Sequence, residues 1–433
     1  MTSLQVGLSI AIFVGAYVLI ATERVHRVAA ALGGAALMVL VGATDAYTAF
    51  FSEQTGVDWN VIFLLLGMMI IVSVVKQSGV FEYLAIRAAK VAGGRPYRVL
   101  VLLCALTALA SALLDNVTTV LLVAPVTLLV CRTIGVRPEP FLIAEVIASN
   151  IGGTATLVGD PPNIIIGSRA GLSFNDFLVN LAPIVVVLLA VFLLLARWLF
   201  RDAYAHRPEH AEALADLDER RAIRDPVLLR RSMLVLGATV LGFVLHGPLG
   251  TEPSMVALLG AGAMVLVTRA SSRQYLEEVE WPTLVFFAGL FVMVGALVNV
   301  GVIESLGTWL VDTVGGDYLA AMTALLFGSA VLSGIIDNIP FVATMTPLVA
   351  DLVAAGSGPQ AQSLWWALAL GADLGGNATA VGASANVVVL GIAARNGFPV
   401  SFWRFTRYGM VVAAITVTLC WPYLYLRYFV LAG

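Results

Sequence analysis

Charged residues are scarce in this sequence. Asp, Glu, Lys and Arg make up 12% of its 433 residues and apolar residues make up 60%, whereas a soluble domain has about 25% charged and roughly 45–50% apolar residues. This imbalance excludes an ordinary soluble protein and predicts an all-α polytopic membrane protein. The net charge of −3 provides no basic surface, so nucleic acid is excluded as a partner.

Lysine, cysteine and histidine are also rare. Neither lysine, Lys76 or Lys90, follows a glycine, so the chain has no phosphate-binding loop and cannot by itself be an ATP-driven pump of that kind. A separate ATPase partner stays open. Cys104, Cys131 and Cys420 are scattered and no His-Glu-x-x-His motif occurs, so no disulfide framework, metal site or catalytic residue is predicted. No cofactor is expected beyond a transported or coupling cation such as sodium.

Apolar runs that can cross a bilayer, which need about 20 residues, occur in both halves. The expected crossings are residues 4–21, 28–44, 60–77, 140–168 and 178–198 in the first half, and residues 231–247, 254–269, 282–299, 363–394 and 408–428 in the second. Residues 98–133 and 318–354 instead form pairs of shorter apolar arms around an Asp-Asn tip. Such arms predict re-entrant hairpins. Amphipathic segments precede them at residues 80–92 and 302–313.

The two halves are related by an internal duplication. Residues 115–125 match residues 337–347 at an offset of 222. Residues 150–163 match residues 373–386 at an offset of 223, with seven identities in fourteen. The predicted organisation is a first repeat at 1–198, a linker at 199–230 and a second repeat at 231–433.

Basic residues indicate how the chain lies in the membrane, because they favour the cytoplasmic side of short loops. With the N-terminus outside, 22 of the 24 basic residues lie in cytoplasmic segments, and only Arg169 and Arg427 lie outside. We therefore expect a multi-pass protein of the cytoplasmic (inner) membrane with a cytoplasmic linker. Five crossings per repeat place the repeats in opposite orientations, as in secondary transporters that bind substrate near the midplane.

Each repeat interrupts its helices at the hairpin tip and at a Gly-Gly-x-Ala-Thr stretch. Such breaks free backbone carbonyls for a cation and N–H groups for an anion. We expect all four to form one substrate- or ion-binding site, with residues Asn116, Thr118, Thr119, Asn150, Gly152, Gly153, Thr154, Thr156, Asp160, Asn163, Asp337, Asn338, Asp373, Gly375, Gly376, Asn377, Thr379 and Asn386. The alternative is that the glycines and threonines only permit close helix packing.

Asp115, Asp160 and Asp373 are the candidates for proton coupling. A carboxylate within an apolar helix costs roughly 2.5–3.5 kcal/mol, and such residues usually bind ions or relay protons. The alternative for Asp115 and Asp337, and also for Asp160, is that they cap the following helix through its backbone N–H groups. Asp160 aligns with Ala383 in the second repeat, so the predicted site is asymmetric.

The tip Leu-Asp-Asn-Val-Thr-Thr at 114–119 and the long motif at 150–163 resemble the ArsB/NhaD/P-protein branch of the ion transporter superfamily. The P-protein subgroup and its prokaryotic relatives, often labelled arsenical-pump membrane proteins, are the most similar. The resemblance implies inverted repeats, paired hairpins and broken helices, in a homodimer whose transport domain moves as an elevator. Related dicarboxylate carriers have Ser-Asn-Thr tips, whereas these tips are Asp-Asn-Val and Asp-Asn-Ile, which argues against a di- or tricarboxylate substrate.

The predicted function is ion-coupled secondary active transport of a small ion or oxyanion, with the lipid bilayer and the small ion as partners. Two alternatives for the transported species stay open: an arsenite-type or other small inorganic solute, and sodium in exchange for protons. An intramembrane aspartyl protease would need Gly-x-Gly-Asp, but Leu157 replaces the first glycine before Asp160. A passive channel fits the inverted repeats less well than alternating access does.

Overall fold

The computed structural model describes residues 2–22, 24–204, 218–269 and 271–431. Within these ranges every regular element is helical, and eight helices are long and apolar enough to cross a membrane. The first-repeat helices are α1 (Ser3–Ala21), α2 (Arg27–Leu40), α3 (Ala46–Phe51), α4 (Trp59–Gln77), α5 (Val80–Val91), α6 (Pro96–Ser111), α7 (Asn116–Ile134), α8 (Glu139–Gly153), α9 (Pro161–Ala170), α10 (Phe174–Asn180), α11 (Ala182–Leu199) and α12 (Arg201–Tyr204).

The second repeat has the same succession of elements. After the short 3-10 helix η1 (Glu219–Ala222) come α14 (Pro226–Leu249), α15 (Pro253–Thr268), α16 (Ser272–Glu277), α17 (Trp281–Asn299), α18 (Val302–Val314), α19 (Tyr318–Ile335), α20 (Asn338–Ala354), α21 (Pro359–Gly375), α22 (Ser384–Arg395), α23 (Phe402–Tyr425) and the π-helical turn η2 (Leu426–Val430). The predicted linker is described on both sides of residues 205–217, which lie outside the described residues.

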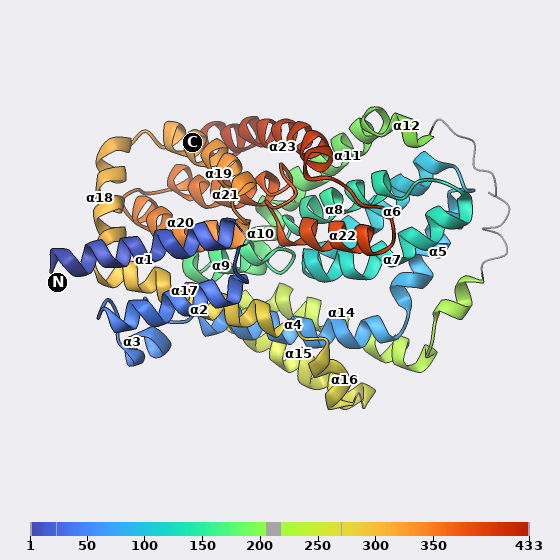
Figure 1. The fold of residues 1–433 in the computed structure, drawn as a ribbon, viewed down its shortest axis with the longest axis horizontal. Helices are drawn as coiled ribbons and strands as arrows, with labels where there is room; N and C mark the ends of the chain where they lie inside the picture. The colour runs from blue at the N-terminus through green and yellow to red at the C-terminus, as the bar shows by residue number, and fades with distance from the viewer. Residues whose placement is uncertain (1, 23, 205–217, 270, 432–433) are drawn as a thin grey trace.

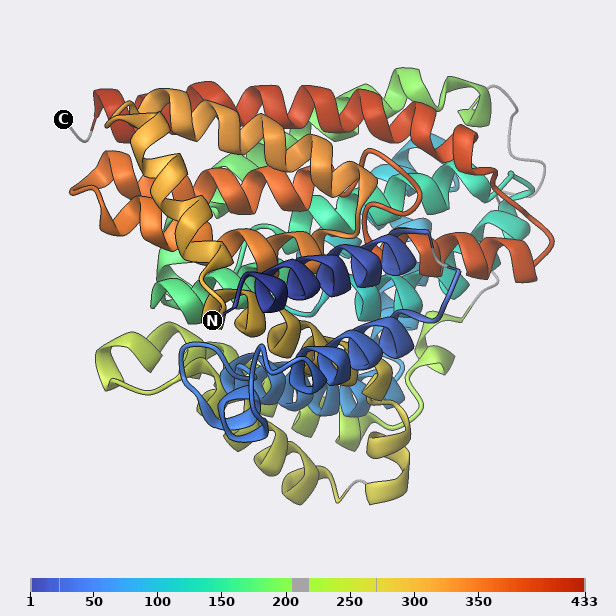
Figure 2. The same ribbon diagram turned by 60° about the vertical axis from the view of Figure 1, so that its left-hand side comes forward.

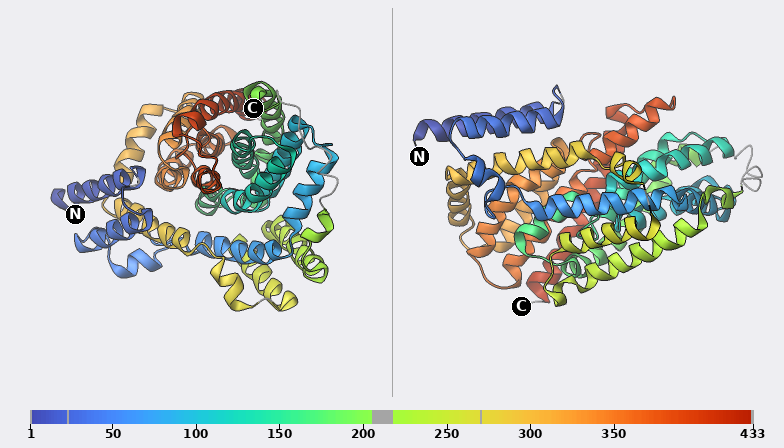
Figure 3. Two further views of the ribbon diagram at one scale, coloured as in Figure 1. Left: turned by 45° about the vertical axis from the view of Figure 1, so that its right-hand side comes forward. Right: turned by 90° about the horizontal axis from the view of Figure 1, so that it is seen from below.

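The helices form two layers, seen nearly end-on at the left of Figure 3. The scaffold layer comprises α1, α2, α4, α14, α15 and α17, with α15 packed on α4 and α17 on α2. The core bundle comprises α6 to α11 and α19 to α23, with α8 packed on α6 and α21 on α19. Helices α5 and α18 stand at the two edges, where they contact α7 and α20.

The two hairpins enter the core bundle from opposite ends of the molecule (Figures 1 and 2). The linker end holds α12 and η1, and the terminus end holds both chain termini. Hairpin α6–α7 extends from the linker end and α19–α20 from the terminus end, so the tips meet near the middle. The sequence prediction of inverted repeats, each with a hairpin and a broken helix, is therefore confirmed.

The same glycine begins the edge helix of each repeat. Gly79 and Gly301 stand before α5 and α18 with φ of 80° and 79°, a left-handed conformation that costs glycine little. The chain turns there from a scaffold helix into an edge helix. The offset of 222 between them shows that the duplication preserved this change of direction.

Candidate functional site

Each broken helix is tied to the hairpin of its own repeat by the same hydrogen bond. Thr156 Oγ1 donates to Ala112 O at 2.6 Å, and Thr379 Oγ1 donates to Gly334 O at 2.7 Å. Donors and acceptors are related by the offsets of the duplication. The two threonines therefore fix the hairpin tips against the breaks.

The first glycine of each Gly-Gly pair allows a hairpin arm to pack directly on the broken helix. A Cβ atom added at Gly152 would lie 2.5 Å from Ala108 Cα, and one added at Gly375 would lie 2.5 Å from Ala330 Cα. Neither distance leaves room for a methyl group. The packing alternative for glycine therefore holds for these two residues, which position the site without offering a side chain to it.

Asparagine side chains join the two repeats at the centre of the core bundle. Asn150 Nδ2 donates to Asn377 Oδ1 at 3.0 Å and to Asn386 Oδ1 at 3.1 Å. Asn116 Nδ2 donates to Asn150 Oδ1 at 3.2 Å and to Asp160 Oδ2 at 2.9 Å. All five residues are buried. The structure therefore brings both breaks and the first hairpin tip into one polar cluster, which we call the asparagine cluster.

Two buried acids border this cluster with incomplete hydrogen bonding. Asp160 is 1% exposed and Asp373 is fully buried. Among the described residues, Asp160 Oδ1 and both carboxylate oxygens of Asp373 lack a hydrogen-bond partner. The two side chains are near enough to interact electrostatically. Buried polar atoms are nearly always satisfied, so these oxygens mark a place where a ligand can bind.

The hairpin-tip acids do cap their helices. Asp115 Oδ1 accepts from Thr118 N at 2.8 Å, and Asp337 Oδ1 accepts from Ile339 N at 3.1 Å. Asp337 Oδ2 also accepts from Ser384 Oγ at 2.6 Å. The capping alternative therefore describes the geometry of both tips.

Asp160 does not cap its helix. It occupies the N-cap position of α9, yet its side chain accepts no hydrogen bond from that helix. The next two residues, Pro161 and Pro162, have no backbone N–H to donate. Capping is therefore the wrong account of the Asp160 side chain, whose partner is the hairpin amide of Asn116.

Most of the other predicted residues make hydrogen bonds or close backbone contacts, and some of them also keep a side-chain atom without a partner. Thr154 Oγ1 donates to Asn150 O, Thr118 gives its backbone N–H to the cap, and Gly153 and Gly376 face the carbonyls of Gly159 and Gly382. Asn163 and Asn386 both donate to carbonyls of their own break. Besides the two acids, four predicted site residues have a buried side-chain atom without a partner in the described part of the chain: Thr119 Oγ1, Asn163 Oδ1, Asn338 Nδ2 and Asn377 Nδ2.

A cavity of about 530 Å³ lies between the scaffold and the core bundle, on the linker side of the second hairpin tip. Arg27, Glu280, Asp337 and Ser384 line it among apolar side chains. Arg27 Nη1 donates to Ser384 Oγ at 2.7 Å and lies 3.9 Å from Asp337 Oδ2. The cavity has the size of typical ligand sites and reaches the second hairpin tip and the start of α22.

Sequence reasoning missed several residues around the site. The sequence places Arg27 only among the 22 basic residues of the cytoplasmic segments, and no motif contains Glu280. Glu280-Trp281 matches Asp58-Trp59 at an offset of 222, and that match could have identified both acids as paired positions. The sequence gives no signal for Arg27 as a lining residue, because this role depends on its contact with Ser384, which is 357 positions away.

The arrangement is suited to a cation. Carboxylate, hydroxyl and amide oxygens are the ligands that hard cations prefer, and the free oxygens come from Asp160, Asp373, Thr119 and Asn163. Among the described residues no group of three His, Cys, Asp or Glu side chains is placed for a metal ion. The cluster thus offers unpaired oxygen acceptors to a small cation or a proton.

Comparisons with known proteins agree with the fold. Residues 17–371 match the family described as "Citrate transporter". An uncharacterized transporter of Mycobacterium tuberculosis is 56% identical over 424 residues, covering 98% of this chain and 99% of the relative. The P protein of Homo sapiens is 34% identical, and the match covers 96% of this chain but 59% of that protein. The crystal structure of the Alcanivorax borkumensis YdaH transporter superposes with a TM-score of 0.59 at 16% identity, covering 90% of this chain and 87% of that one.

Proposed function

Because the chain belongs to the citrate transporter family and is a membrane transporter rather than an enzyme, we propose that it is a secondary active transporter driven by a cation. The cation, sodium or a proton, binds between Asp160 and Asp373. One observation carries the proposal: the two acids, one from each repeat, are buried with three carboxylate oxygens lacking a partner. Two buried charges without compensation are costly, and a bound cation or proton removes that cost.

The same geometry explains how one site exchanges sodium for protons. Removal of water favours the protonated form of a carboxylate, whereas a bound cation favours the charged form. Sodium and protons therefore compete for the carboxylates. We propose sodium/proton exchange as the best-supported activity, since an anionic cargo is repelled by the two acids.

A second candidate is an anionic cargo held in the cavity beside the site. Arg27 is its one arginine among the described lining residues and lies over the Phe286 ring at 5.5 Å. Glu280 and Asp337 line the same cavity, so its charge favours a small oxyanion over a citrate-like molecule with several carboxylates. The observation that supports this candidate is the Arg27 guanidinium, which lines the cavity 3.9 Å from Asp337 at the second hairpin tip.

We also propose how the protein works in the membrane. The core bundle moves against the scaffold layer to expose the site to each side in turn. The linker faces the cytoplasm and both termini face outward, in agreement with the distribution of basic residues. The 530 Å³ cavity then opens toward the cytoplasm.

Reconstitution into liposomes tests the proposal. Purified protein is inserted into vesicles containing a pH-sensitive dye, and an inward sodium gradient is imposed. We expect sodium-dependent alkalinisation of the lumen that empty vesicles do not show, because each sodium that enters is exchanged for a proton that leaves, and an acidic lumen should drive radioactive sodium uptake. Uptake of arsenite by the reconstituted protein, without any flux of sodium or protons, would favour the second candidate.

A further inference from the structure

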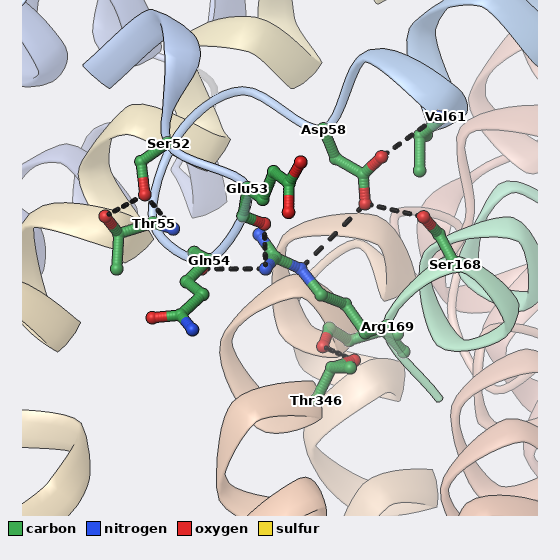
Figure 4. Close-up of polar contacts among 10 residues, drawn as sticks. Ser52, Glu53, Gln54, Thr55, Asp58, Val61, Ser168, Arg169 and Thr346 are labelled. Atoms are coloured by element: carbon green, nitrogen blue, oxygen red, sulfur yellow. Dashed lines mark hydrogen bonds and ion pairs between the residues drawn. The ribbon is translucent and has the colours of Figure 1, made fainter. Parts of the chain in front are cut away.

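A second polar cluster surrounds Arg169 and includes Glu53, Gln54, Asp58 and Ser168 (Figure 4). Arg169 is eight residues beyond Pro161, the first residue of α9, and therefore lies about 12 Å along the helix from the break. Its guanidinium Nη1 donates to Gln54 O at 2.7 Å and to Glu53 O at 3.3 Å. These contacts cross from the core bundle to the loop between α3 and α4, on the scaffold side.

The same scaffold loop receives a second set of contacts through Asp58. Ser168 Oγ donates to Asp58 Oδ2 at 2.8 Å, and Arg169 Nε lies 3.9 Å from the same oxygen. Asp58 Oδ1 also accepts from Val61 N at 3.3 Å and so caps α4. One carboxylate therefore joins the end of a core helix to the start of a scaffold helix (Figure 4).

The acceptor loop is held firmly on the scaffold. Ser52 Oγ accepts from both the backbone N and the hydroxyl of Thr55, and Val57 N donates to Ala49 O. The Thr55 backbone also packs so closely on Gly295 of α17 that a Cβ there would clash with it. Movement of α9 relative to the scaffold must therefore break the Arg169 contacts, because the loop cannot follow.

The linker end lacks an equivalent contact at the far end of α22 among the described residues. Glu280, which matches Asp58 in the duplication, accepts from Thr283 of its own helix and faces the 530 Å³ cavity. The end of α22 is bonded inside the core instead, through Arg132 and Asn396 O at 3.2 Å. The far end of α9 is thus joined to the scaffold, whereas on the linker side only the start of α22 is reached, through Arg27 and Ser384 among the described residues.

We propose that Arg169, Ser168 and Asp58 form a latch that keeps the terminus end closed while the linker end is open. The latch is a positioning device for transport, and this inference rests on the proposed movement of the core bundle against the scaffold. Release of the latch shifts the population toward the state that is open at the terminus end. Arg169 binds no cargo and no coupling ion in this account.

Two cysteine reporters, each placed alone in a background without Cys104, Cys131 and Cys420, test the latch. Ala343→Cys lines a cavity of only about 20 Å³ next to Arg169, and Val388→Cys lines the open cavity at the linker end. Membrane-impermeant maleimide is applied to each side of cells and inverted vesicles. The wild-type background should protect residue 343 and label residue 388.

Arg169→Ala should change both reporters in opposite directions, by about fivefold or more, as for a coupling of this size. Labelling at 343 should rise and labelling at 388 should fall. Asp58→Asn, which retains the cap on α4, should give the same pattern more weakly and replaces Arg169→Ala if that variant does not fold. The matched control is Arg427→Ala, because Arg427 donates to Asn180 within the core bundle and should change neither reporter.

An increase at 343 without a decrease at 388 would mean that the substitution only opened a local hole, and it would overturn the proposal. No change at either reporter would do the same. The labelling needs no cargo and no gradient, so failure of the sodium/proton assay leaves this result readable by itself.

Discussion

The two broken helices have the same backbone plan but place their acid on opposite sides of the break. The first repeat has Asn150 before the break and Asp160 after it, whereas the second repeat has Asp373 before the break and Ala383 after it. Glycine contacts and threonine ties are the same in both repeats. The two repeats have therefore kept the same backbone contacts at the break. Their acidic residues differ in position, and each repeat supplies one acid beside the asparagine cluster.

The largest effect is expected from Asp160→Asn. The substitution removes a carboxylate that is hydrogen-bonded to the hairpin tip through Asn116, and cation affinity depends strongly on the number of charged ligands. We expect gradient-driven sodium or proton flux in proteoliposomes to fall by about 100-fold or more, with normal membrane insertion. Normal flux in this variant would show that Asp160 is only a structural residue.

Asp373→Asn should weaken transport less. Asp373 accepts no hydrogen bond among the described residues, so its amide replacement disturbs the asparagine cluster less than the replacement of Asp160 does. We expect a loss of about tenfold in flux at low sodium, as for removal of one charged ligand, with partial recovery at high sodium. A loss larger than that of Asp160→Asn would show that the acid of the second repeat contributes more to transport than the acid of the first.

Substitution of the first glycine of each Gly-Gly pair should lower folding stability equally in the two repeats. Gly152→Ala and Gly375→Ala each force a methyl group against the backbone of a hairpin arm, which should cost about 1–3 kcal/mol of folding stability. Thermal unfolding in detergent should show similar decreases in Tm for both. Gly33→Ala is the matched control, since a Cβ there meets nothing within 4 Å. A decrease in Tm for only one of the two variants would show that the two hairpins do not pack on their broken helices in the same way.

The hairpin caps should matter less than the glycines. Asp115→Ala and Asp337→Ala each remove an N-cap acceptor, at a cost of about 1 kcal/mol. The corresponding Asn variants retain a cap and should lose little stability in the same thermal assay. A large loss of transport in Asp115→Asn without loss of stability would instead assign Asp115 to proton coupling.

The smallest effect concerns an ionic contact present in one repeat. Lys90 of α5 lies 2.5 Å from Glu219 Oε2, and its hydrogen bond holds the pKa of Glu219 below the ordinary value. A lowered pKa stabilises the fold above the ordinary value, and this contribution is lost as the pH falls through the lowered value. Glu219→Gln should therefore lower Tm slightly at neutral pH and not at acidic pH. An equal difference at both pH values would rule out the charge as its cause.

The hairpins and broken helices could be predicted because short stretches of the sequence determine them. The apolar arms around Asp115 and Asp337 predicted the two hairpins, and the matching motifs predicted that two broken helices form one inverted pair. Residues whose roles depend on distant packing could not be found in this way. Arg27 contacts a residue 357 positions away, and Arg169 contacts the α3–α4 loop more than a hundred positions before it.

The chemical roles within the motif were harder to predict than its location. Thr156 and Thr379 were predicted as ligands, but their hydroxyls donate to hairpin carbonyls. Asp160 and Asp337 were both open to a capping interpretation, and the structure separates them. Pro162 removes one of the N–H donors that a cap uses, and the next donor, Asn163 N, bonds to the backbone O of Asp160 rather than to its side chain. The binding roles of the remaining residues stay a prediction.

The central claim is that Asp160 and Asp373 belong to one cation site, and a double-mutant cycle of sodium binding tests it most directly. Sodium affinity is measured by titration calorimetry on purified wild type, on Asp160→Asn, on Asp373→Asn and on the double variant, at several pH values. The account predicts that acid weakens wild-type binding, that each single variant loses most of it, and that the double variant is no worse than the weaker single variant. Wild-type affinity in both single variants, or losses that simply add, would contradict a shared site.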